Sequence, residues 1–399
     1  MMKVLTSFFL LLACLCLSVS ASTVVEETVS IGKVSRISID SKALGETRKL
    51  LIHLPASYTK SNRAYPVLYL VDGNRHIEHA IVSTNLLQRQ NRIPEQIIVA
   101  VSNNDKGDHD PDMAISKFTA FFKNEVIPYI NSNYKTSRLN TLYGQTKAGW
   151  FTAEMLANQP ELFSNYILAS APLQDDEVKL YNKILANGSE QNSQVKSLYI
   201  AVSKEANEPS RYTDAYNKLV NLLTENPPKN LNWRSELLTE QVHMTTSIPS
   251  LYNGLTHVFD SYQAPSFADL KEYEDFGEIK GLEDYYNKRA KIYGVTPKIG
   301  EDTLLNLATM LLNEQEYKKS LELYLTVTLN YPESAAAYSG VGQIYYALKQ
   351  YDKSMSAHQK SVELSRKLNP VWQQNLFQSR LDKVEKEKNN LAKVNSKGG

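Results

Sequence analysis

The sequence predicts an α/β protein in which a mostly parallel sheet with flanking helices is followed by a small all-α domain. Two observations predict this class. Between residues 28 and 262, short apolar runs alternate with segments whose apolar residues have helical spacing. Between residues 301 and 390, a helical pattern repeats after 34 residues. Alternating strands and helices are typical of a parallel sheet that is covered on both faces.

Residues 1–21 have the features of a signal peptide. Lys3 supplies a positive charge, residues 4–17 form an apolar stretch, and Val19-Ser20-Ala21 is a small-residue cleavage site. The apolar stretch is too short to favour a membrane-spanning helix. We therefore expect an exported protein, either periplasmic or secreted.

Both cysteines of the chain, Cys14 and Cys16, lie in this first segment. Cleavage after Ala21 would leave a mature chain with neither a disulfide nor a thiol. An alternative is that Leu11-Leu12-Ala13-Cys14 resembles a bacterial lipobox, although Leu12 is unusual there and the apolar run continues beyond Cys14. Membrane attachment is expected only if Cys14 carries a lipid.

The domain between residues 28 and 262 contains the apolar runs expected to form the sheet. Helical spacing of apolar residues appears at 117–130 and 210–223. Ligands of such folds bind at the carboxyl ends of the strands. The strand candidates include Arg48–His53, Val67–Val71, Gln96–Val101, Leu139–Tyr143, Tyr166–Ala169 and Leu198–Val202.

Residues 144–149, Gly-Gln-Thr-Lys-Ala-Gly, link a predicted strand to a predicted helix. A tight, glycine-rich turn of this kind holds the nucleophile of an α/β-hydrolase in the pattern G-x-S-x-G. Here Thr146 takes the serine position and Ala148 the closing glycine position. A β-branched residue is disfavoured at positive φ. Either the turn tolerates this strain, or it has relaxed into an ordinary turn with Thr146 as a helix N-cap.

Four further blocks accompany this turn: residues 63–73, 118–130, 162–172 and 240–255. The first reads as a strand that ends in an Asp-Gly turn. In their order and spacing the blocks resemble the putative esterase family of α/β-hydrolases, which includes esterase D-like and enterochelin esterase-like enzymes. The resemblance implies an α/β-hydrolase fold over residues 28–262 and the hydrolysis of a carboxylic ester.

The resemblance also implies roles for individual residues. Thr146 stands at the position of the nucleophile, and His243 matches the histidine that acts as general base and then as general acid. The backbone N–H of Lys147, with one near Gly73 and Asn74, would form the oxyanion hole.

The acid of a catalytic triad should follow the predicted strand 198–202. Glu205 is the first candidate, with Glu208 or Asp214 behind it. The resulting chain order of hydroxyl, acid and histidine agrees with the α/β-hydrolase pattern.

After a break at Pro265, residues 269–298 are expected to form a helical linker, and residues 301–390 resemble tetratricopeptide repeats. The alternative is two unrelated amphipathic hairpins. Stacked repeats offer a concave surface for a protein or peptide partner. The residues that match at an offset of 34 are Leu304 and Tyr338, Leu307 and Val341, Ala308 and Gly342, Leu311 and Tyr345, Tyr317 and Tyr351, Ser320 and Ser354, and Tyr324 and His358.

The charge balance limits the class of partner. With 44 basic and 43 acidic residues, the formal net charge is +1, which gives no reason to expect nucleic acid. Two functions remain open: an esterase that acts on a small-molecule ester without a metal or cofactor, or a catalytically inactive esterase fold that binds a partner through its helical repeats.

Overall fold

The structure is a computed structural model that describes residues 33–102, 115–172, 177–188, 195–204, 206 and 208–397. The predicted signal peptide, with Cys14 and Cys16, lies outside these residues, and so does Glu205. Among the helices that the structure describes, none is both long enough and apolar enough to cross a bilayer.

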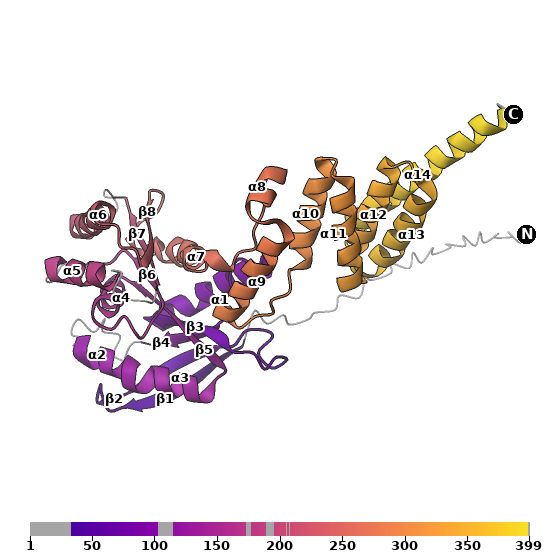
Figure 1. The fold of residues 1–399 in the computed structure, drawn as a ribbon. Helices are drawn as coiled ribbons and strands as arrows, with labels where there is room; N and C mark the ends of the chain where they lie inside the picture. The colour runs from indigo at the N-terminus through magenta and orange to yellow at the C-terminus, as the bar shows by residue number, and fades with distance from the viewer. Residues whose placement is uncertain are drawn as a thin grey trace, which may run out of the picture. The chain divides into compact units, whose positions relative to one another are not determined.

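In the described chain, eight strands form one sheet in the order β1-β2-β4-β3-β5-β6-β7-β8 (Figure 1). β2 pairs antiparallel with β1 and β4, whereas β3 to β8 run parallel to one another. The strands are β1 (Val34–Ser41), β2 (Glu46–His53), β3 (Tyr65–Val71), β4 (Ile97–Val101), β5 (Thr136–Gln145), β6 (Asn165–Ala169), β7 (Lys196–Ser203) and β8 (Leu231–Leu238).

Helices cover both faces of the sheet (Figure 1). One apolar core lies under α2 (Ile115–Phe121), the π-helical turn η1 (Phe122–Val126), α3 (Ile127–Asn133), α4 (Lys147–Asn158), α5 (Glu177–Asn187) and α6 (Ser210–Glu225). The other lies under α1 (Gly73–Arg89) and α7 (Ser247–Val258). β3 is buried along its whole length, as expected for a central parallel strand. The predicted fold class is confirmed.

The order in which successive strands join the sheet reverses at β3. The chain passes from β3 through α1 to β4 on one side, then returns to β5 on the other side of β3. In an open α/β sheet, the carboxyl ends at such a switch point border a crevice. Asp72 follows β3 and Thr146 follows β5, and the paired residues Leu70 and Tyr143 lie just before them. The topology therefore brings these two strand ends together.

The C-terminal region is helical, with α10 (Glu301–Asn313), α11 (Tyr317–Asn330), α12 (Ala335–Ala347), α13 (Tyr351–Leu368) and α14 (Val371–Lys397). The first two helices and the next two begin at equivalent positions, 34 residues apart. Their side-chain contacts repeat as well: Ser320 Oγ donates to Ala308 O (2.6 Å), and Ser354 Oγ donates to Gly342 O (2.7 Å). This repetition agrees with the offset in the sequence; the tetratricopeptide character stays a prediction.

Helix α9 (Glu278–Tyr293) connects the two regions, after η4 (Asp260–Tyr262) and α8 (Leu270–Asp275). Tyr293, at its end, packs in the core beneath α1 and α7, with its ring 5.1 Å from that of Tyr262. Tyr286, two turns earlier, packs with Leu307 and Leu311 of α10. The same helix thus contributes to the core of the sheet region and to the helical core.

Candidate active site

The corner between β5 and α4 holds Thr146 in a conformation that β-branched residues rarely adopt, with φ +56° and ψ −123°. The N–H of Thr146 donates to Ala169 O (2.9 Å), and the N–H of Trp150 donates to Thr146 O (3.0 Å). The Thr146 side chain makes no capping hydrogen bond. Of the two alternatives left by the sequence, the strained corner is therefore present and the capped turn is absent.

Small residues allow this corner to form. A Cβ on Gly144 would lie 2.1 Å from Ala148 O, and one on Gly149 would lie 2.9 Å from the Cβ of Ala171. Ala148 itself is fully buried. The corner thus has room for the Ala148 side chain at the position where the hydrolase pattern has glycine. The positions at which a side chain would clash are 144 and 149.

The side chain of His243 contacts that of Thr146. It opens the short helix η3 (His243–Thr245), and its Nε2 lies 2.9 Å from Thr146 Oγ1. The side-chain amide of Gln145 donates to His243 O (2.9 Å) and to Thr246 Oγ1 (3.2 Å), so the residue beside Thr146 fixes the histidine's backbone. The His243 ring lies 5.0 Å from that of Tyr212. A hydroxyl and an imidazole at hydrogen-bond distance can exchange a proton.

Glu208 completes this arrangement. His243 Nδ1 donates to Glu208 Oε1, while the hydroxyls of Ser203 and Ser170 (3.1 Å) donate to Oε2. Burial alone would raise the pKa of Glu208, but the hydrogen bonds from His243, Ser203 and Ser170 outweigh it and hold that pKa below its ordinary value. The side chain is therefore a buried carboxylate that fixes the ring orientation of His243.

The three acid candidates from the sequence have different outcomes. Glu208, named behind Glu205, contacts His243. Asp214 lies exposed on α6. Glu205 lies outside the described residues. The carboxylate that the structure places at His243 is that of Glu208, and which of the candidates is the catalytic acid stays a prediction.

A cavity of about 200 Å³ opens at Thr146 and His243. Its wall includes Lys147, the first residue of α4, and Asp72, which precedes α1 and has φ +57°. The N–H groups in the first turn of a helix have no partner within the helix and favour negative charge. Two such helix starts therefore face one cavity.

Gly73 and Asn74, predicted near the oxyanion hole, are the first two residues of α1 but are not among the residues that line this cavity. Gly73 is buried, and a Cβ there would lie 2.4 Å from Ala100 Cβ on β4. A glycine is therefore required at position 73 for close packing of the start of α1 on β4.

The family can be named from the comparison of the sequence with known families. A family model described as "Putative esterase" matches residues 41–262, more than half of the chain. The chain belongs to the putative esterase family. The match includes Thr146, Glu208 and His243. No curated protein is similar enough to the chain to count as a match.

Solved structures share the fold of this esterase-family chain. An IroE-like serine hydrolase from Shewanella oneidensis is 24% identical, with a TM-score of 0.57 over 73% of this chain and 98% of that one. An uncharacterised protein from Capnocytophaga ochracea is 19% identical, with a TM-score of 0.59 over 88% and 99%. The BES protein from Bacillus cereus is 17% identical, with a TM-score of 0.50 over 59% and 99%.

A pair of histidines, His76 and His79, lies at the esterase-family site, and one of them, His76, lines its cavity. His76, which lines the cavity, has its Nδ1 3.0 Å from Nε2 of His79, and its ring meets that of Tyr143 edge-on at 5.1 Å. Burial lowers the pKa of His76 to about 3, helped by His79 and Arg75, and burial lowers the pKa of His79 to about 4. Both rings are thus uncharged at neutral pH, and His76 adds a polar but uncharged group to the cavity that Thr146 lines.

We expect acid to destabilise the protein through this pair. In the unfolded chain both histidines take up protons near pH 6.5, but in the folded chain only near pH 3 to 4, so the folded state binds fewer protons between these values. The free energy of unfolding should therefore fall with decreasing pH, by about 1.4 kcal/mol per pH unit for each histidine. Denaturant unfolding of the wild type and of a His76→Gln, His79→Gln double variant, from neutral pH to pH 4, measures this slope. Equal slopes for the two proteins would contradict the expectation.

Proposed function

We propose that this protein hydrolyses a carboxylic ester, with Thr146 as nucleophile, His243 as general base and Glu208 as the acid that orients it. The observation that carries the proposal is the 2.9 Å contact between Thr146 Oγ1 and His243 Nε2, made by a residue held at φ +56°. A strained corner that aims a hydroxyl at an imidazole is the arrangement of a nucleophile elbow.

In the first half of the reaction, Nε2 of His243 accepts the proton of the Thr146 hydroxyl as Oγ1 attacks the ester carbonyl carbon. The negative charge of Glu208 stabilises the imidazolium that forms. Collapse of the tetrahedral intermediate breaks the bond to the alcohol oxygen, and His243 returns its proton to that oxygen. The products of this half are an acyl-threonine and a free alcohol.

In the second half, His243 removes a proton from water, whose oxygen attacks the acyl carbon, and then protonates Thr146 Oγ1 as the acid leaves. In both halves the carbonyl oxygen becomes negative. The N–H of Lys147 and a second N–H at the start of α1, near Gly73 and Asn74, are the donors proposed to stabilise it.

The size of the cavity favours a small acyl group. At about 200 Å³, it is below the volume typical of pockets for drug-sized ligands. The substrate proposed here is therefore a small-molecule ester with a short acyl chain, and the residues named in the reaction need no metal or cofactor.

Turnover of p-nitrophenyl acetate and butyrate tests this function. Wild type should exceed His243→Ala and Thr146→Ala on both esters, because each variant lacks a reacting group. Thr146→Ser should be at least as active as wild type, since it keeps the hydroxyl and removes the β-branch from a strained corner. A wild-type rate equal to that of His243→Ala would overturn the proposal.

A second candidate function is binding without catalysis. The observations that favour it are the threonine and alanine at positions 146 and 148 and a groove of about 450 Å³ across α11, α12 and α13, lined in part by Leu325, Tyr338 and Tyr345. Such a groove suits a protein or peptide segment. In a deletion strain, complementation by Thr146→Ala as well as by wild type would favour this candidate, and failure of that variant would count against it.

The proposed esterase is also an exported protein. Residues 1–21 supply the signal that supports export to the periplasm or the exterior, with lipidation at Cys14 as the alternative. The proposed division of the mature chain places the esterase domain at 28–262, the linker at 269–298 and the tetratricopeptide-like repeats at 301–390.

A further inference from the structure

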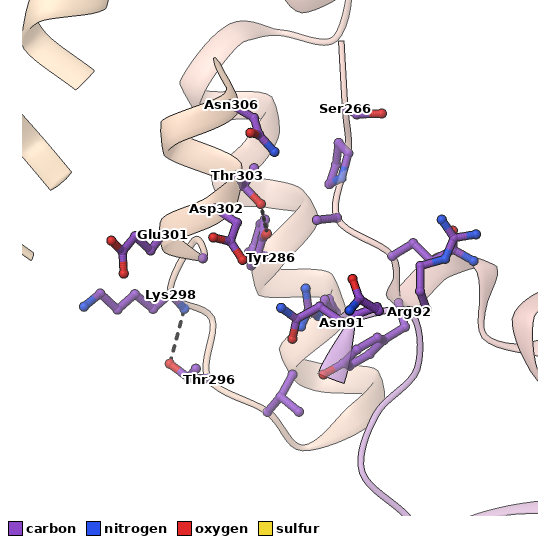
Figure 2. Close-up of a pocket in the computed structure, with 18 of the residues that line it drawn as sticks. Asn91, Arg92, Ser266, Tyr286, Thr296, Lys298, Glu301, Asp302, Thr303 and Asn306 are labelled. Atoms are coloured by element: carbon purple, nitrogen blue, oxygen red, sulfur yellow. Dashed lines mark hydrogen bonds between the residues drawn. The ribbon is translucent and has the colours of Figure 1, made fainter. Parts of the chain in front are cut away.

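A second and larger cavity shares no lining residue with the cavity at Thr146. It has a volume of about 850 Å³ and is formed by the loop after α1, the segment between η4 and α8, helix α9 and the start of α10 (Figure 2). All of its residues belong to the compact unit that runs from Gly32 to Gly399. Its volume is within the range of small-molecule sites.

This cavity is separate from the candidate active site. Arg63 comes just before β3, and Asn91 and Arg92 lie between α1 and β4, so these wall residues stand at the amino ends of parallel strands. Thr146 follows the carboxyl end of β5. The two sites thus lie at opposite edges of the sheet, and a ligand in one does not touch the reacting groups of the other.

The walls of the cavity are held in place by packed tyrosines. Tyr286 is buried, and its hydroxyl lies 2.8 Å from Thr303 Oγ1 in the first turn of α10 (Figure 2). Tyr293, one residue before the cavity's loop, is hydrogen bonded to Ser261 Oγ (2.8 Å). The cavity is therefore a preformed space between fixed helices, which reduces the cost of ordering on binding.

Two arginines in this wall have no carboxylate partner among the described residues. Arg289 lies over the ring of Tyr262 at 3.9 Å and that of Tyr286 at 5.1 Å, and its buried Nε makes no hydrogen bond. Arg92 forms no ion pair in the described chain. The two other cations are engaged: Arg63 pairs with Glu95, and Lys298 donates to Asn330 O. A guanidinium whose flat face is covered by rings presents its N–H edge, the geometry that binds carboxylate or phosphate.

The opposite wall is uncharged or acidic. Figure 2 shows Asp302, Thr303 and Asn306 on α10, across the cavity from Asn91 and Arg92. Amide, hydroxyl and carboxylate groups of this kind accept and donate hydrogen bonds to hydroxyl groups. The cavity therefore combines an anion-binding side with a side suited to a hydroxyl-rich molecule.

We propose that this cavity is a binding site for a small, hydroxyl-rich molecule that carries a carboxylate or a phosphate, such as a sugar acid or a sugar phosphate. Arg289 and Arg92 bind the anionic group, and the residues of α10 bind the hydroxyls. The proposal does not depend on ester hydrolysis, because none of these residues belongs to the candidate active site.

Isothermal titration calorimetry on the full mature chain tests this site with three probes of similar size: digalacturonate, sucrose 6-phosphate and the neutral sugar maltose. We expect at least one of the two anions to bind with a Kd of about 1 mM or below, and maltose to bind at least tenfold more weakly. Comparison of the two anions distinguishes carboxylate from phosphate. Absence of binding by both anions, or equal binding of maltose, would overturn the proposal.

Variants locate the binding. Arg289→Met should weaken binding of the anion at least tenfold, whereas Arg36→Met, a matched change on the exposed edge strand β1, and Thr146→Ala should bind like wild type. Circular dichroism and Tm check the fold of each variant. If Arg289→Met does not fold, Arg92→Met replaces it, since Arg92 is exposed. Unchanged affinity in the folded arginine variant contradicts the assignment.

Discussion

Glu208→Gln is expected to lower kcat for ester hydrolysis by about 10³- to 10⁴-fold. A glutamine side chain cannot stabilise the imidazolium, and its amide can present a donor to Nδ1 of His243, which would place the proton of the neutral ring on Nε2. Nε2 then has no lone pair with which to accept the proton of Thr146. Rates with p-nitrophenyl acetate, measured beside wild type, give this ratio.

Two further variants show whether the loss of activity is specific to Glu208. Asp214→Asn, an exposed acid on α6, should leave the rate within about twofold of wild type, as distant surface changes usually do. Glu205→Gln tests the residue that the sequence favoured. Should Glu205→Gln lose activity while Glu208→Gln keeps it, Glu208 is not the acid of the proposed triad.

A thermal unfolding measurement separates catalysis from folding at Glu208. Its carboxylate accepts hydrogen bonds from Ser203 and Ser170, so glutamine also changes a buried network. Because the pKa of Glu208 is lowered in the folded state, its stabilising contribution is present above the ordinary glutamate pKa and is lost as pH falls through the folded value. Wild type should therefore have a higher Tm than Glu208→Gln near neutral pH, and this difference should shrink as the pH falls below the ordinary glutamate pKa. A variant that is inactive but still folded at the assay temperature has lost catalysis and not its fold.

The sequence could predict the sheet because its central strands are buried on both faces. β3 reads as a continuous apolar run, and the predicted strand 67–71 falls inside it. The edge strands β1 and β8 were not among the candidates. Most of their residues are exposed or half-buried, and charged residues such as Arg234 and Glu236 interrupt the apolar pattern. These edge strands are identified by their pairing with β2 and β7, which is visible only in the folded sheet.

The candidate site was predictable in part. Thr146 and His243 are 97 positions apart, and only the resemblance to the esterase family brought them together in advance. Nothing in the sequence ranks Glu208 above Glu205. The two residues are only three positions apart, and the fold decides which carboxylate reaches the His243 ring. The contacts that fix it, from Ser170 and Ser203, come from the ends of two other strands. Such convergence is a property of the folded sheet.

The strained corner also shows why the sequence left the state of Thr146 open. Local preference disfavours a β-branched residue at positive φ, and by itself it predicts the relaxed turn. In the folded chain, hydrogen bonds from the backbone of Thr146 to β6 and α4, together with tight contacts at Gly144 and Gly149, fix the corner. Tertiary contacts therefore override the local preference, at a cost of about 1–3 kcal/mol.

Gly144→Ala is expected to destabilise the fold by more than about 4 kcal/mol, because the added Cβ would overlap backbone. It would lie 2.1 Å from Ala148 O and 2.6 Å from Thr152 Oγ1, in the first turns of α4, and the carbonyl cannot move without displacing the helix start that holds Lys147. Urea unfolding measures the loss. Gly300→Ala is the control: its Cβ would come no closer than 3.7 Å to another residue, so the change should cost less than about 1 kcal/mol. If Gly144→Ala proves as stable as Gly300→Ala, the corner is looser than the contacts of α4 imply. The fixed geometry that the proposed attack by Thr146 requires would then be absent.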